Sequence, residues 1–127
     1  MDQPQTGTTQ SAPEYDFESA YANQSLVEMS EWDLKVIFGQ VEQHTGKAAV
    51  NWHTAVTMPW LHAKLLSYYL RVSLAAYELT HGKIKVPANV LPPKPEPPNK
   101  KQLASDPNAK AVYQAVKNLH AEAFEST

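Results

Sequence analysis

The sequence predicts an α+β fold, in which a small antiparallel sheet of three to four strands is packed by one long helix. Two patterns lead to this prediction. Much of residues 26–58 alternates between apolar and polar side chains, as strands do, whereas residues 58–82 repeat apolar side chains at helical steps. A third element, a separate C-terminal helix, is expected after a proline-rich stretch that neither pattern can continue.

The chain has 127 residues, which suits one small domain, and its composition changes along its length. We predict a disordered tail at 1–20, an α+β core domain at 21–91, a Pro-rich linker at 92–105 and a short amphipathic helix at 106–125. A core of about 70 residues is marginal by itself. We therefore expect a homo-oligomer, a dimer or larger.

Three strands are expected in the core domain, at residues 26–29, 32–41 and 48–57. A turn at Ser30 and Glu31 separates the first two strands. Gly39 within the second strand indicates a bulge or a close backbone approach. The short turn at 44–47 contains a glycine, so the last two strands should form an antiparallel hairpin.

The long helix is predicted from its ends and its periodicity. Pro59 suits the first turn of a helix, and Gly82 suits the position just past the end. One apolar stripe should form the core of the fold; it comprises Leu61, Leu65, Tyr68, Val72, Ala75, Ala76 and Leu79. After the helix, residues 83–86 are expected to add an edge strand that Pro87 ends.

Apolar side chains outside the predicted core are candidates for binding surfaces. The expected interface between copies consists of Ile37, Val41, Tyr69 and Leu74. In the C-terminal helix, Asp106 and Pro107 form the start signal. Its apolar stripe consists of Val112, Val116 and Leu119. We expect this stripe to bind a protein partner, or to fold back on the domain or on a neighbouring subunit.

Catalytic and metal-binding patterns are not supported by the sequence. Its four glycines do not form a phosphate-binding loop, and without cysteine it has no disulfide, thiol nucleophile or thiolate metal site. Glu78 and His81 have the spacing of a metal-ligand pair. A histidine that interacts with the end of the helix is the favoured interpretation. We expect a protein that is not an enzyme and has no metal and no cofactor.

The charge distribution gives only weak support for a nucleic-acid partner. The net charge is −2, with eight acids and two lysines in residues 1–58 and nine basic groups and five acids in residues 59–127. Nucleic acid is an unlikely partner because the basic residues are not clustered. The helix at 58–82 carries three charged residues, so no membrane contact is expected. A cytoplasmic location is expected because the sequence has no cysteine and no recognisable signal peptide.

Several short motifs occur in a fixed order along the core domain. They are Tyr21-Ala22-Asn23, Phe38-Gly39, Met58-Pro59, His62-Ala63-Lys64, Tyr77-Glu78 and Gly82-Lys83-Ile84. In this order they resemble the bacterial and archaeal DUF3467 family, over roughly residues 20–92. That family has no established activity, so the resemblance implies no catalytic residue and no ligand.

The function predicted from these observations is a protein-binding or scaffolding domain that self-associates. Two alternatives remain open. One is a holdase chaperone with an exposed apolar groove, similar in element order to SecB-type proteins. The other is a weak nucleic-acid binding module that uses Lys64, Arg71, Lys83 and Lys85.

Overall fold

A computed structural model describes residues 16–44 and 46–125 of the chain. Most of the predicted disordered tail, residues 1–15, lies outside the described residues, and residues 16–20 carry no regular secondary structure. The chain consists of two compact units, Met1–Tyr68 and Tyr69–Thr127, and the boundary between them falls inside the long helix.

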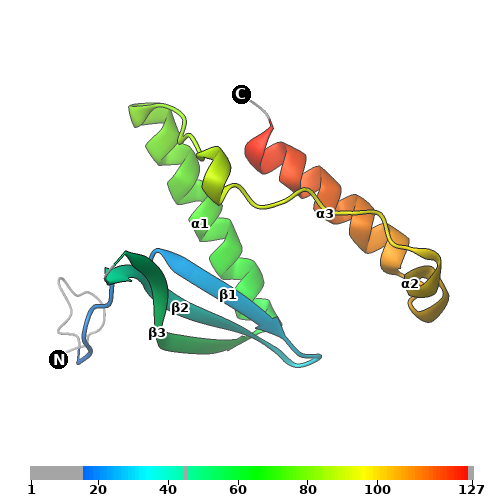
Figure 1. The fold of residues 1–127 in the computed structure, drawn as a ribbon, viewed down its shortest axis with the longest axis horizontal. Coiled ribbons are helices and arrows are strands. Elements are labelled where there is room, and N and C mark those ends of the chain that lie inside the picture. Colours follow the sequence, from blue (N-terminus) through cyan, green and yellow to red (C-terminus); the bar gives the residue numbers. More distant parts are fainter. Residues whose placement is uncertain (1–15, 45, 126–127) are drawn as a thin grey trace, which may run out of the picture. The chain divides into compact units, whose positions relative to one another are not determined.

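The first unit contains an antiparallel sheet of three strands, which confirms the predicted sheet and hairpin (Figure 1). The strands are β1 (Gln24–Met29), β2 (Asp33–His44) and β3 (Lys47–Pro59), and they lie in the order β1-β2-β3. Each strand pairs with its neighbour in sequence. The turn between β1 and β2 is built around Ser30, whose hydroxyl accepts hydrogen bonds from the backbone N–H groups of Trp32 and Asp33.

Gly39 marks the bulge that the sequence predicts. The register shifts between Phe38, which is opposite Thr54, and Gly39, which is opposite Trp52, so His53 is the extra residue in β3. A Cβ at Gly39 would lie 2.7 Å from the Trp52 side chain and 2.9 Å from the Asn51 carbonyl oxygen. Glycine is therefore required by close approach between β2 and β3.

The long helix α1 (Trp60–His81) follows β3 without a loop. Pro59 is the last residue of β3, so its predicted place in the first helical turn is wrong by one position. The Trp60 Nε1 donates to the Ser30 carbonyl 3.0 Å away and ties the helix start to the β1–β2 turn. Gly82 has φ 91°, which confirms the predicted helix end.

The predicted edge strand at 83–86 is wrong, because these residues have no regular secondary structure. The Ile84 backbone N–H donates instead to Glu78 Oε2, 2.9 Å away. The Glu78 carboxylate thus accepts the hydrogen bond that the Ile84 N–H would donate to a neighbouring strand if residues 83–86 were part of the sheet.

The second unit continues through η2 (Ala88–Val90), α2 (Lys100–Ser105) and α3 (Ala109–Phe124). A helix at 100–105 contradicts the expectation of linker there. Asn99 and Gln102 explain it, because their side chains and backbones exchange the two hydrogen bonds of a capping box. The last helix, predicted from Asp106, begins three residues later, and the Asp106 carboxylate accepts from the Asn108 N–H.

Candidate interaction surfaces

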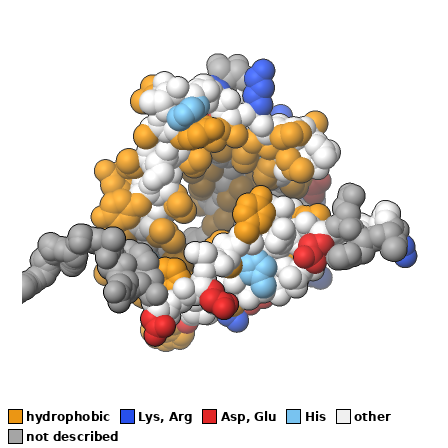
Figure 2. Space-filling view, turned by 90° about the vertical axis from the view of Figure 1, so that its left-hand side faces the viewer, with side chains coloured by type: hydrophobic (Ala, Val, Ile, Leu, Met, Phe, Trp, Pro, Cys, Tyr) orange, Lys and Arg blue, Asp and Glu red, His pale blue; other side chains and the backbone are white. Residues whose placement is uncertain are grey.

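The described side chains of a single chain form almost no hydrophobic core. Among them, Met58 is the one hydrophobic side chain that is buried, with 7% exposed. No residue of α1 is buried, although its stripe is expected to be the core. Apolar side chains (orange) instead occupy much of the face drawn in Figure 2.

The apolar stripe of α1 is open to solvent along the whole helix. Leu61 is 73% exposed, Leu65 48% and Leu79 88%. The large apolar side chains of α1 leave on the order of 1,000 Å² exposed, whereas the largest patch of a typical monomer has about 300–600 Å². A standard interface covers about 800 Å² on each partner. The exposed apolar surface of α1, counted around the whole helix, is thus as large as one side of a protein–protein interface.

A different face of α1 is the one partly covered within the first unit. Ala63 and Leu66 are half-buried, whereas Leu61 and Leu65 are exposed. At 100° per residue, Ala63 and Leu66 lie on the side of the helix opposite the stripe. The periodicity therefore predicts correctly which residues of α1 share the apolar stripe. Within one chain, however, the partly covered face of the helix is the opposite one, with Ala63 and Leu66.

The four residues expected at an interface between copies have mixed environments. Ile37 and Val41 are half-buried in β2, where Ile37 pairs with Leu26 on one side and Ala55 on the other. Tyr69 and Leu74 are exposed on α1. The sheet residues thus already have neighbours, and the two helix residues carry most of the accessible apolar surface.

In the second unit, the proline-rich segment lies along α3 (Figure 1). Pro95 and Pro98 are half-buried and are three residues apart, which is one turn of a polyproline II helix. One stripe of α3 is covered as well; it consists of Ala109, Tyr113, His120 and Phe124. We call residues 92–98 the proline strap. It contacts α3, whereas the sequence predicts a semi-rigid Pro-rich linker with no folded partner.

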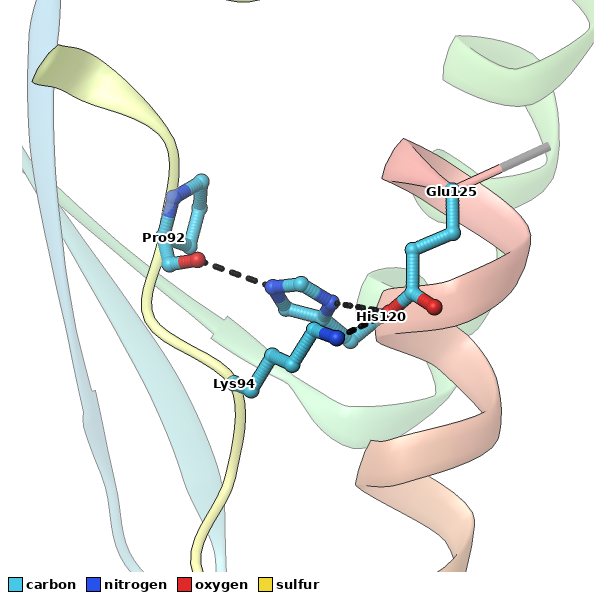
Figure 3. Close-up of polar contacts among 4 residues, drawn as sticks. All are labelled: Pro92, Lys94, His120 and Glu125. Atoms are coloured by element: carbon cyan, nitrogen blue, oxygen red, sulfur yellow. Dashed lines mark hydrogen bonds and ion pairs between the residues drawn. The ribbon is translucent and has the colours of Figure 1, made fainter. Parts of the chain in front are cut away.

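His120 connects the proline strap to α3 (Figure 3). Its side chain is 7% exposed, the one buried polar side chain among the described residues. The Nε2 donates to the Pro92 carbonyl oxygen at 2.8 Å, and Nδ1 lies 3.2 Å from Glu125 Oε2. The Phe124 ring packs edge-on at 5.2 Å between centroids, and Lys94 Nζ lies 4.0 Å from the same carboxylate.

The role of His120 cannot be predicted from local sequence, because its main partner is a backbone carbonyl 28 positions away. The three-residue spacing of the prolines was the available signal, since one polyproline turn advances by three residues. The predicted binding stripe of α3, Val112, Val116 and Leu119, lies beside the covered face and is exposed. The strap therefore leaves that stripe accessible.

His53, the bulged residue of β3, borders a polar hollow of about 370 Å³ in the first unit. The His53 Nε2 donates to the Tyr21 carbonyl oxygen at 2.9 Å, and Nδ1 lies 2.7 Å from Thr54 Oγ1. The Nε2 contact holds the chain before β1 against β3, while the Nδ1 contact stays within β3. This gives His53 a structural role.

The residues considered for chemistry have structural partners. Glu78 binds the Ile84 N–H, and His81 stacks on Tyr77 at 4.4 Å. Across residues 16–44 and 46–125, no three His, Asp or Glu side chains gather as a metal site would require. Of the basic residues considered for nucleic acid, Arg71 donates to Glu122 at 3.0 Å.

None of the helices in the described part of the chain is both long and apolar enough to cross a membrane. A search of curated proteins and a search of solved structures found no match. The family described as "Protein of unknown function (DUF3467)" matches residues 2–86, which is more than half of the chain. The predicted resemblance is confirmed, and the chain belongs to the DUF3467 family.

Proposed function

We propose that this chain is a non-enzymatic protein-binding domain of the cytoplasm that self-associates through α1 and offers α3 to a protein partner. The observation that supports self-association is the exposed stripe of α1, together with a single buried hydrophobic side chain among those described. Burial of apolar surface is the main favourable term in folding and association. A second copy would supply the surface that one chain lacks.

The test is the oligomeric state of the full chain in solution, measured by sedimentation. Leu65→Glu places a charge on the stripe and should turn an oligomer into a monomer, because a buried unpaired charge is strongly unfavourable. His62→Glu adds the same charge at an exposed position off the stripe and should leave the oligomer intact. A monomeric wild type, or an unchanged Leu65→Glu oligomer, would contradict the proposal.

The proposed partner site on α3 is the stripe of Val112, Val116 and Leu119, which is exposed beside the strap-covered face. Amphipathic helices present such side chains to grooves in partner proteins. Affinity capture with the full chain should retain a partner that Val116→Glu loses and Ala111→Glu keeps. Ala111 is exposed on the same helix but off the stripe, so loss by both variants would indicate a non-specific effect of charge.

The exposed apolar surface also favours one alternative, a holdase chaperone that keeps its stripe open for unfolded clients. The two proposals differ in what covers α1 in the native assembly. If copies cover the stripe, a dye for apolar surface should bind the Leu65→Glu monomer more than the wild-type oligomer. Strong dye binding by the native oligomer would favour the holdase.

A further inference from the structure

β3 is an edge strand of the described sheet, and its outer side has no strand beside it. It is 13 residues long, against six for the other edge strand, β1. Lys47 is its one charged residue, and its one proline, Pro59, stands at its end. Natural edge strands are normally interrupted by charges or proline, or kept short, to prevent pairing with another chain. β3 has little of this protection.

The bulge at His53 divides β3 into two arms of different character. The first arm, 47–52, carries Lys47 and leads to the hairpin turn. The second arm, 54–59, is uncharged and keeps a regular register with β2, from Thr54 opposite Phe38 to Pro59 opposite Asp33. Because a bulge bends the strand that contains it, a straight neighbouring strand fits one arm only. The second arm is therefore the better site for pairing with a strand of another chain.

We propose that residues 54–59 pair antiparallel with the same residues of a second copy, joining two sheets into one of six strands. This inference rests on the proposed self-association and adds the β3 edge to α1 as a surface on which the copies meet. A two-fold axis would place one residue of the arm directly opposite its own copy, and the residues before and after it would pair with each other. No two charges meet across such a pair, because the arm contains none.

The start of α1 limits how two paired copies can be arranged. Trp60, the first residue of α1, is four residues after Val56, or about 13 Å along an extended chain. If the axis passes through Val56, the two helices begin on opposite sides of it, about 26 Å apart along the strands. The start of each α1 then lies beside the first arm of the other copy. The strand pairing therefore does not require contact between the two stripes.

The chain contains no cysteine, so single cysteines can report which residues face each other. We would make Ala55→Cys, Val56→Cys and Thr57→Cys in the full chain, with Ala49→Cys in the first arm and Ser25→Cys in β1 as controls. Directly opposed residues of an antiparallel pair lie about 4.5–5.5 Å apart at Cα, within reach of a disulfide. Under mild oxidation, one second-arm variant should form a disulfide-linked dimer at least about ten times faster than both controls.

Three results would overturn the inference, and they separate it from the proposed function. Fastest cross-linking at Ser25 would assign the contact to the β1 edge. An associating wild type without cross-linking at residues 55–57 would show that the copies meet elsewhere, leaving self-association intact. A monomeric wild type would remove both proposals. Circular dichroism of each reduced variant verifies that the sheet is retained.

Discussion

At the scale of single residues, Gly39 has the strictest steric requirement in the sheet. A methyl group there would lie 2.7 Å from Trp52 and 2.9 Å from a backbone oxygen, so the strands must move to admit it. We predict that Gly39→Ala lowers the free energy of unfolding by about 1–3 kcal/mol, as overpacking does. Denaturant titration measures the loss.

Ala49→Val is the control for Gly39, because it adds apolar bulk at an exposed position of the same hairpin. Its stability should change by no more than about 0.5 kcal/mol. Equal stability of Gly39→Ala and the wild type would show that β2 and β3 separate easily at the bulge.

Predictions for single residues are confirmed where the backbone conformation or a close backbone contact requires glycine. Gly39 at the bulge and Gly82 at the helix end were identified because few residues other than glycine are tolerated there. Asn23, part of a family motif, accepts from the Val41 N–H and donates its own N–H to the Gly39 carbonyl. His120 could not be found in this way, because its burial depends on a partner distant in sequence.

At the scale of elements, periodicity predicted which residues share a face but not what covers that face. The spacing predicts the helix α1 correctly, yet its partly covered apolar side chains are Ala63 and Leu66, which lie off the stripe. Residues 83–86 have strand-like composition, but a side chain binds the Ile84 amide. Composition therefore predicts an element poorly where a single side-chain hydrogen bond, such as that from the Ile84 amide to Glu78, takes the place of strand pairing.

The proline strap provides a prediction for the second unit. His120→Ala removes the donor to the Pro92 carbonyl and the neighbour of Glu125. We expect the strap to detach from α3, at a local cost of about 1–3 kcal/mol for the unsatisfied groups. The ¹H–¹⁵N heteronuclear NOEs of Lys94 and Glu96 should fall as the segment becomes mobile.

Lys110→Ala is the matched control for the strap, since Lys110 is exposed on the same helix. The NOEs of Lys94 and Glu96 should stay at wild-type values in this variant. Unchanged NOEs in His120→Ala would mean that the proline contacts alone hold the strap.

At the scale of the whole molecule, stability should depend on concentration. If a second copy covers the exposed stripe, association stabilises the folded state by mass action. We predict that the thermal midpoint of the wild type rises with protein concentration, by several degrees per tenfold change for a small domain. Calorimetry over a hundredfold range of concentration measures this.

Leu65→Glu should lose this concentration dependence, while His62→Glu should keep it. A wild-type midpoint that is constant with concentration would contradict coupling between folding and association. The sequence predicted the need for a partner from the small size of the core, but it could not rank the surfaces, because exposure depends on packing.

The pairing of each strand with its neighbour in sequence also has a kinetic consequence. Every ladder of the sheet closes across a short turn, so its loop-closure entropy is small. Sheets of low contact order form quickly. During synthesis, the strands can pair as soon as Pro59 has left the ribosome, before α1 has emerged from it. The sheet would therefore be in place before the apolar stripe becomes available for aggregation or for assembly.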